Sequence, residues 1–158
     1  MDELLRERAR TLANRERQEV DYGTPYLVFL LADERYALPL AGLAGVVRIE
    51  RLTVVPGCAS ELTGLLNVRG EIRPIYDLKR LLGRDEEEES WTKSLALLTT
   101  LSGLAVGLKV SEVEGLLKVS KVDKRVSSSY SIGRTESGAT LLDLHLLEQH
   151  PLFKEEAV

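Results

Sequence analysis

The sequence predicts a mainly β protein, built as small barrels or as a sandwich. Short apolar stretches of strand length recur along most of the chain, and several alternate between apolar and polar residues with the period of two that is typical of strands. Residues that favour turns separate these stretches. With 158 residues and 44% apolar content, the chain is long enough for one domain or for two small lobes that share a core.

Residues 1–19 precede the strand pattern and have the spacing of a charged amphipathic helix. Leu5, Ala9 and Leu12 fall on one face of that helix. Because this apolar stripe is short, we expect a solvated extension that packs lightly on the domain. A helix that docks on a partner is the alternative.

The first strands are predicted at 26–31 and 36–40, as a hairpin whose loop is the polar segment 32–35. A third strand is predicted at 46–50, where apolar residues again have strand spacing.

The stretch 62–78 is the most informative part of the chain, because it predicts a strand, a glycine turn, a second strand and a capped helix. In the first strand Leu66 belongs to an apolar face, while Asn67 and Arg69 share a polar face. Gly70 can adopt the positive φ that a tight reversal requires. We therefore expect Asn67 and Arg69 to lie on an outward face, where they suit docking better than packing.

The second strand of this hairpin is expected to continue the apolar face through Ile72, Pro74 and Tyr76. Pro74 has no N–H to donate to a neighbouring strand, which favours an edge position or a bulge. Asp77 is a good N-cap for a short helix at 78–82, which the following glycine can end.

Later strands are predicted at 94–100 and 104–110, on either side of a turn at 101–103, and apolar residues at 113–119 continue the pattern. The strand at 104–110 alternates cleanly, which predicts one buried and one exposed face. The sequence Leu-Leu-Asp-Leu at 141–144 repeats the pattern Ile-Tyr-Asp-Leu of 75–78, so each is expected to be a strand that ends in an Asp-capped helical turn.

Residues 85–89 form an acidic run that is typical of a solvated loop. A cation site is the alternative, but consecutive side chains cannot all point at one ion. Trp91 follows the run and is expected to anchor the chain back onto a core.

The composition disfavours several classes of function. The net charge is −4, the pI is near 5.3, no basic stripe stands out and aromatic residues are sparse, so a barrel that binds RNA or chromatin is disfavoured. No apolar run approaches the length of a membrane span, and the charged N-terminus is unlike a signal peptide, so we expect no direct membrane insertion. Cys58 is the single cysteine, which excludes an internal disulfide and suits a reducing cytoplasm.

The residues needed for catalysis do not form a recognisable set. The two histidines, His145 and His150, both lie near the C-terminus, and Cys58 has no histidine close in sequence. The glycines lack the Lys-Ser/Thr that completes a phosphate-binding loop. We therefore predict no enzyme, no metal site and no cofactor.

The spacing G-x-x-N-x-R-G-x-x-x-P-x-x-D-L, which begins at Gly64, resembles that of the CheW family of chemotaxis coupling proteins. The resemblance extends through residues 24–148 and includes the strand pairs at the N-terminus and the later strands. It implies two small five-stranded SH3-like β-barrel lobes of pseudo-symmetric topology, with short helices. Residues 1–22 would then be an N-terminal amphipathic helical extension, 23–150 the CheW-like domain and 151–158 a C-terminal tail.

The resemblance also implies a function and its residues. Members of this family are non-catalytic scaffolds that couple the cytoplasmic tips of chemoreceptors to a CheA-type histidine kinase, and they act in the cytoplasm at receptor arrays on the inner face of the membrane. By this resemblance Ile72 would bind the kinase, and the receptor would be bound by Leu43, Gly64, Asn67 and Arg69.

Two positions depart from the family pattern. Gly45 stands where members often have a glutamate that pairs with the arginine of the turn, so Arg69 is expected to use Glu71 or Glu50 instead. Ser111 replaces a frequent aspartate. These departures leave open a divergent adaptor of a pathway that does not control flagella, and a β-barrel that binds a small ligand is the alternative from another class.

Overall fold

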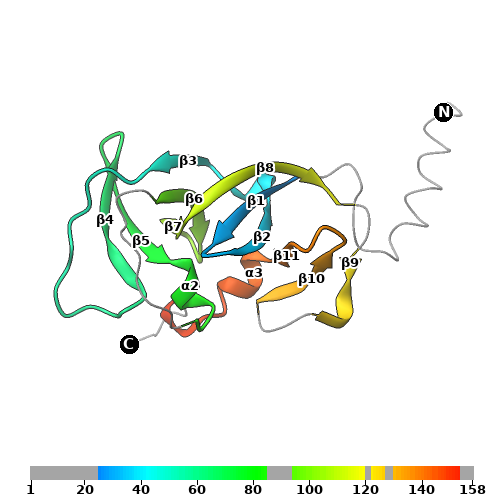
Figure 1. Ribbon diagram of the computed structural model, residues 1–158. Helices are drawn as coiled ribbons and strands as arrows, with labels where there is room; N and C mark the ends of the chain where they lie inside the picture. Colours follow the sequence, from blue (N-terminus) through cyan, green and yellow to red (C-terminus); the bar gives the residue numbers. More distant parts are fainter. Residues whose placement is uncertain (1–24, 85–93, 120–121, 127–129, 154–158) are drawn as a thin grey trace, which may run out of the picture.

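Two curled β-sheets pack against each other in the computed structural model, which describes residues 25–84, 94–119, 122–126 and 130–153 (Figure 1). The predicted N-terminal helix, the acidic run and Trp91 lie outside the described residues. The observed architecture confirms the mainly β class and its two lobes.

Lobe A is the six-stranded sheet with the order β8-β1-β2-β11-β10-β9, in which β2 and β11 are parallel and the other neighbours are antiparallel. Beyond the five strands expected for a lobe, it has the two-residue strand β9. Its strands are β1 (Pro25–Leu31), β2 (Glu34–Pro39), β8 (Glu112–Lys118), β9 (Val122–Asp123), β10 (Ser131–Thr135) and β11 (Thr140–Leu142).

Lobe B is the five-stranded sheet with the order β3-β6-β7-β5-β4, in which β5 and β7 are parallel. Its strands are β3 (Gly45–Arg48), β4 (Leu62–Val68), β5 (Glu71–Asp77), β6 (Leu95–Leu101) and β7 (Leu104–Val110). Both lobes are built around a hairpin, β1–β2 or β6–β7, which has an antiparallel strand on one side and a parallel strand on the other. Short helical turns follow several strands: η2 (Leu40–Gly42), α2 (Leu78–Leu81), η4 (Lys124–Val126), α3 (Leu144–Leu147) and η5 (Pro151–Phe153).

The repeated sequence pattern occupies equivalent places in the two lobes, as expected. β5 leads into α2 and β11 leads into α3, and each helix begins at an aspartate that accepts a hydrogen bond from a backbone N–H two residues on. The oxygen–nitrogen distances are 3.1 Å from Asp77 to Lys79 and 2.8 Å from Asp143 to His145. These caps satisfy donors that the first helical turn leaves unpaired.

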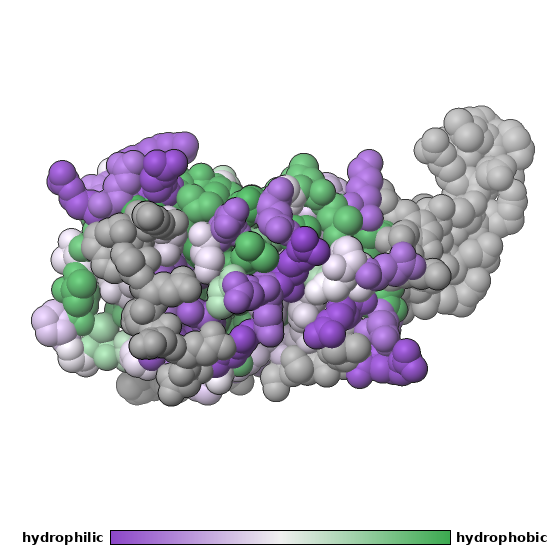
Figure 2. Space-filling view, viewed as in Figure 1, coloured by the Kyte–Doolittle hydropathy of each residue, from purple (hydrophilic) through white to green (hydrophobic). Residues whose placement is uncertain are grey.

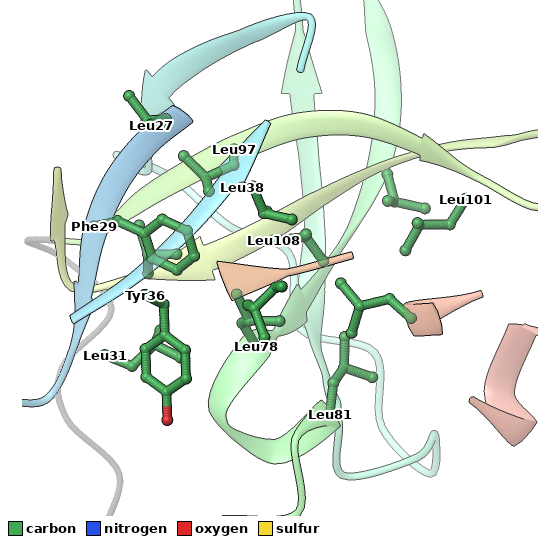
Figure 3. Close-up of a cluster of buried hydrophobic side chains, with 14 of the residues drawn as sticks. Leu27, Phe29, Leu31, Tyr36, Leu38, Leu78, Leu81, Leu97, Leu101 and Leu108 are labelled. Carbon is green, nitrogen blue, oxygen red and sulfur yellow. The ribbon is translucent and has the colours of Figure 1, made fainter. Parts of the chain in front are cut away.

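The largest hydrophobic core lies between the lobes and not inside either of them. Among the residues that the structure describes, it contains 15 buried residues, whereas the interiors of lobe A and lobe B contain 5 each. Figure 3 shows how Phe29 and Leu38 of lobe A meet Leu97 and Leu108 of lobe B in this shared core. Alternate residues of the hairpin strands therefore point into the shared core and into the lobe interior.

The structure corrects the prediction for β7, which is buried on both faces along most of its length. Gly107 faces the interior of lobe B, where an added Cβ would lie only 2.5 Å from Ile75 Cδ1. Lys109 is 5% exposed, and its Nζ lies 3.6 Å from Asp77 Oδ2. The alternation predicted an exposed face because glycine and lysine do not have the apolar side chains by which a buried strand face is normally recognised in a sequence.

Candidate docking surface

The β4–β5 hairpin reverses through Arg69 and Gly70, which have φ angles of +54° and +89°. Positive φ at both central residues is typical of the two-residue type I′ turn, which matches the twist of the flanking strands. The Gly70 N–H donates to Asn67 Oδ1 at 2.8 Å, so the asparagine side chain closes the turn. Arg69 is held in a left-handed conformation that costs an L-residue about 1–2 kcal/mol.

The pairing register of this hairpin decides which side chains face outward. Asn67 lies opposite Ile72, and Leu66 lies opposite Arg73. Because directly opposed residues point to the same face of a sheet, Ile72 shares the outward face with Asn67. The expectation that Ile72 continues the apolar face of Leu66 was therefore wrong, and Ile72 is 57% exposed.

Arg69 is exposed and forms no ion pair within the part of the chain that the structure describes. Glu71, which we expected to accept from it, is instead paired with Arg73, whose Nε lies 3.3 Å from Glu71 Oε1. The predicted pair with Glu50 does not form either among the described residues. The guanidinium of Arg69 is therefore presented to solvent at the tip of the hairpin.

Gly64 is explained by a close backbone approach. An added Cβ would lie 2.6 Å from Thr53 O and 2.9 Å from Leu52 Cγ, and Thr53 pairs with the neighbouring Leu65 across an isolated bridge. The segment that precedes β4 therefore lies alongside this strand, so close to it at Gly64 that only a glycine leaves room.

Leu43 lies on a different segment from the other four predicted positions, immediately after η2. It is half-buried, packs against the shared core and donates its N–H to Leu40 O at 3.0 Å. The structure thus brings Gly64, Asn67, Arg69 and Ile72 together on one hairpin and places Leu43 apart from them. Figure 2 shows hydrophilic residues gathered over the tip of the hairpin and the nearby end of β3, at the upper left.

Arg73 was missed at the level of the sequence, although it is the best-anchored polar side chain of this hairpin. Its Nη1 donates to Val106 O at 2.9 Å and to Thr99 O at 3.2 Å, and its side chain is 13% exposed. Counting residues across a two-residue turn would have placed it opposite Leu66, on the inner face.

Pro74 marks the place where β5 changes its neighbours. β5 pairs with β4 along its length, but its pairing with β7 begins only at Ile75. Pro74 therefore lacks an N–H on a stretch that is an edge toward β7, as predicted.

Ser111, one of the two departures from the family pattern, has a structural partner. Its Oγ accepts the N–H of Ala32 at 3.1 Å, at the turn between β1 and β2, and its own N–H donates to Leu30 O. This departure is thus used in holding the start of β8 against the first hairpin.

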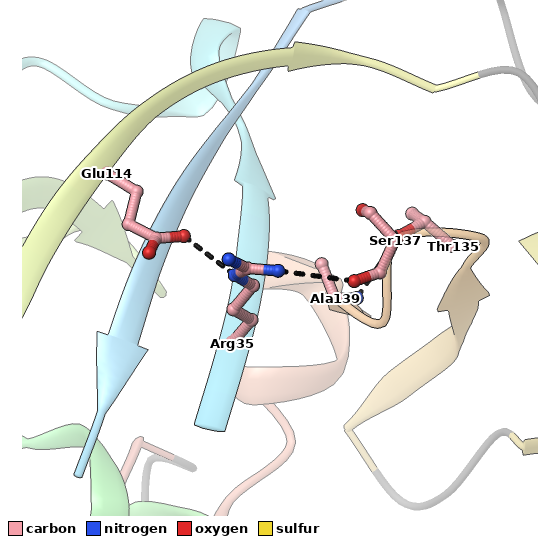
Figure 4. Close-up of polar contacts among 5 residues, drawn as sticks. All are labelled: Arg35, Glu114, Thr135, Ser137 and Ala139. Carbon is pink, nitrogen blue, oxygen red and sulfur yellow. Dashed lines mark hydrogen bonds and ion pairs between the residues drawn. The ribbon is translucent and has the colours of Figure 1, made fainter. Parts of the chain in front are cut away.

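A second polar region lies in lobe A, around Arg35. Arg35 Nε is 2.8 Å from Glu114 Oε1, and its Nη1 donates to Ser137 O at 3.3 Å (Figure 4). The adjacent hollow of about 540 Å³ is lined largely by charged residues, including Glu34 and Arg134. Such a lining differs from the mostly apolar walls of typical small-ligand sites.

Near this hollow, Glu34, Tyr36 and Arg84 are joined by hydrogen bonds. Arg84 donates to Glu34 and to the hydroxyl of Tyr36, and the hydrogen bond from Arg84 is the main reason that the pKa of Glu34 is lowered. The pKa of Tyr36 is raised, first by burial and then by its hydrogen bond to Glu34.

The two histidines and the cysteine do not form a catalytic or metal-binding group among the described residues. His150 Nδ1 accepts the N–H of Leu152 at 3.1 Å, and its ring stacks on Tyr130 with centroids 6.0 Å apart. His145 is exposed, and Cys58 is exposed with its thiol 2.9 Å from Val55 O. Among the described residues, no three potential metal ligands cluster, and no helix is long and apolar enough to cross a membrane.

Comparison with known proteins relates the chain to one family. The model of the CheW-like domain matches residues 25–149. The chemotaxis protein CheW of Bacillus subtilis (strain 168) is 25% identical over 101 residues, which are 64% of this chain and 64% of that protein. The chain thus matches slightly less than two thirds of that relative. CheW of Treponema pallidum (strain Nichols) is 24% identical over 135 residues, which cover 77% of this chain and 79% of that protein.

A solved structure has the same fold. The crystal structure of the scaffolding protein TtCheW from Thermoanaerobacter tengcongensis superposes with a TM-score of 0.70 at 24% identity. The match covers 85% of this chain and 97% of that one.

Proposed function

The chain belongs to the CheW family, and we propose that it is a non-catalytic adaptor that couples the cytoplasmic tips of chemoreceptors to a CheA-type histidine kinase. In this proposal it has no cofactor and acts in the cytoplasm, at receptor arrays that it reaches through its partners. Its relatives carry the name of chemotaxis proteins, and the protein of similar fold is described as a scaffolding protein.

The observation that carries the proposal is the state of Arg69. An arginine at φ +54° is strained, and the described residues offer its guanidinium no ion pair in return. A planar guanidinium that is presented on a closed turn suits bidentate binding of a carboxylate or of the carbonyls at a helix end. The tip of a receptor is helical in this family, so Arg69 and Asn67 are proposed to bind it, together with Leu43 and Gly64.

Ile72 supports the second contact. It is 57% exposed, lies directly opposite Asn67 and belongs to the outward face of the β4–β5 hairpin. Docking between barrels is expected to bury an apolar centre inside a polar rim, and Ile72 is proposed to supply that centre toward the kinase. The two proposed surfaces would then share a border at this residue pair.

Calorimetry on folded variants tests the two contacts separately. Ile72→Arg would bury a charge and is expected to weaken kinase binding by more than about 1.5 kcal/mol. A few residues at the centre of an interface carry most of its binding energy, so a charge placed there is costly. Leu116→Arg is the matched control, since Leu116 is 62% exposed but lies on β8 of lobe A. Unchanged kinase affinity in Ile72→Arg would remove this residue from the interface.

Receptor binding is tested with Arg69→Ala and Arg69→Lys. Both are expected to weaken binding of a receptor-tip fragment while kinase binding persists, because a lysine cannot reproduce the fork of donors. Arg51→Ala, at an exposed arginine outside the hairpin, should leave both affinities unchanged. Wild-type receptor affinity in both Arg69 variants would show that the guanidinium is only solvated.

A further inference from the structure

Arg73 connects the hairpin tip to the centre of lobe B. Its Nη1 reaches the carbonyl oxygens of Val106 and Thr99, at 2.9 and 3.2 Å, while its Nε holds Glu71. Thr99 and Val106 are opposed residues of the β6–β7 hairpin, so one guanidinium spans two strands of the sheet and the start of a third.

This link replaces pairing that the sheet lacks. β5 has no partner on the β7 side before Ile75, and Pro74 has no N–H with which to extend that pairing. Residues 67–72 therefore project beyond the parallel part of the sheet, where Arg73 joins them to β6 and β7 by hydrogen bonds, beside the packing of Val68 against the core of lobe B. Without Arg73, the packing of Val68 alone would hold this two-stranded tip, and a two-stranded hairpin is marginally stable by itself.

Thr99 extends the connection to Leu43. While its carbonyl oxygen accepts from Arg73, its hydroxyl donates to Gly42 O at 2.6 Å, one residue before Leu43. Thr99 is 2% exposed, and the N–H of Ala44 donates to the neighbouring Leu98 O at 2.7 Å. The two separate segments that carry the predicted docking positions thus meet at one buried residue of β6.

We propose that Arg73 is a positioning residue that fixes the β4–β5 hairpin on β6–β7, and that Thr99 sets Leu43 at a defined place relative to it. The consequence for binding rests on the proposed function, whereas the consequence for the hairpin itself does not. The arrangement pre-organises a two-segment surface, which lowers the conformational cost of docking.

Hydrogen exchange of the free protein, measured by NMR, tests the positioning. Arg73→Met should raise the exchange rates of amides in residues 67–72 about tenfold and leave lobe A unchanged, because local opening becomes easier. Arg35→Met is the matched control, since Arg35 also joins a carboxylate to a backbone carbonyl, but in lobe A. Unchanged exchange at 67–72 in Arg73→Met, or an equal rise in Arg35→Met, would overturn the proposal.

Two further variants keep the test decisive. Arg73→Lys retains a donor for the carbonyl oxygens but cannot also hold Glu71. The amides of residues 67–72 should therefore exchange at rates between those of the wild type and of Arg73→Met. If Arg73→Met does not fold, the rates of Arg73→Lys test the proposal in its place. Thr99→Val keeps the carbonyl oxygen and removes the bond to Gly42, so it should alter exchange at 43–44 and spare the hairpin. Loosening of the hairpin in Thr99→Val would contradict the division of roles.

Binding separates this inference from the function on which it partly rests. If the wild-type protein binds the kinase, Arg73→Met should lower the affinity about tenfold through the mobile hairpin. If the wild-type protein does not bind, the proposed function fails, while hydrogen exchange still decides whether Arg73 positions the hairpin. A loosened hairpin that binds with wild-type affinity would overturn the role of Arg73 in docking.

Discussion

The two lobes use the same Asp-capped turn in opposite surroundings. In lobe B, Asp77 is 4% exposed and lies within 3.7 Å of both Lys109 and Arg80, while in lobe A the capping Asp143 is half-exposed. Both aspartates accept the N–H two residues on. The cap is therefore what the local backbone requires, and the buried ion pair is an addition in one lobe.

The difference shows that the carboxylate of the capping aspartate has a second role only in lobe B, where it compensates a buried charge. Lys109 lies on β7, which is buried on both faces, so its ammonium depends on Asp77 for compensation. A charge in such a place is costly unless it is paired. In lobe A, His145 lies two residues after Asp143 and is exposed, so it does not need Asp143 to compensate a buried charge.

Replacing the two capping residues is expected to give the largest contrast. Asp77→Ala should lower the free energy of unfolding by about 4 kcal/mol, because it leaves Lys109 buried and unpaired. Asp143→Ala should cost about 1 kcal/mol, the usual loss of an N-cap. Urea unfolding of both variants measures the difference, and equal losses would show that Lys109 is compensated elsewhere.

A double variant isolates the contribution of the charge. Asp77→Ala combined with Lys109→Met removes both partners of the ion pair, so it should be more stable than Asp77→Ala alone. If the double variant is less stable than the single one, the loss in Asp77→Ala comes from the cap and from packing.

The second contrast is between the core that lies between the two lobes and the smaller core inside lobe B. Leu108→Ala in the shared core should cost about 3 kcal/mol, and Leu66→Ala inside lobe B about 2 kcal/mol, since the loss follows the cavity that each leaves. Both variants should still unfold in one transition, because the largest core belongs to both lobes. Unfolding curves recorded from amides of lobe A and lobe B that do not coincide would contradict this.

Local patterns carried most of the successful predictions. Asp77 and Gly70 act within a few residues of their own positions, so their roles as cap and turn could be predicted from the sequence. The inward direction of Arg73 depends on the register across the turn, and the burial of Lys109 depends on packing between two sheets. Both depend on contacts that are distant in sequence. Alternation alone therefore gave Arg73 no role and predicted an exposed face where Lys109 is buried.

The two tight turns of lobe B provide the smallest and most specific contrast. Arg69 and Ser102 both adopt left-handed conformations, with φ of +54° and +51°, and each precedes a glycine of positive φ. The N–H of Ser102 has an internal partner, Glu148 Oε2 at 2.8 Å, which a glycine would retain. The described residues give the side chain of Arg69 no ion pair, so a glycine there would lose no such interaction.

Arg69→Gly and Ser102→Gly should therefore have similar effects on stability and different effects on binding. Removing the side chain relieves about 1–2 kcal/mol of left-handed strain, and the greater freedom of an unfolded glycine opposes it by about 0.5–1 kcal/mol, so each variant should gain about 0.5 kcal/mol. Only Arg69→Gly should lose affinity for the receptor tip, because Arg69 belongs to the proposed docking surface and Ser102 does not. Chemical denaturation and calorimetry on the same samples check both expectations. A loss of stability in Arg69→Gly alone would mean that the guanidinium stabilises the fold, and that its strained position needs no partner to explain it.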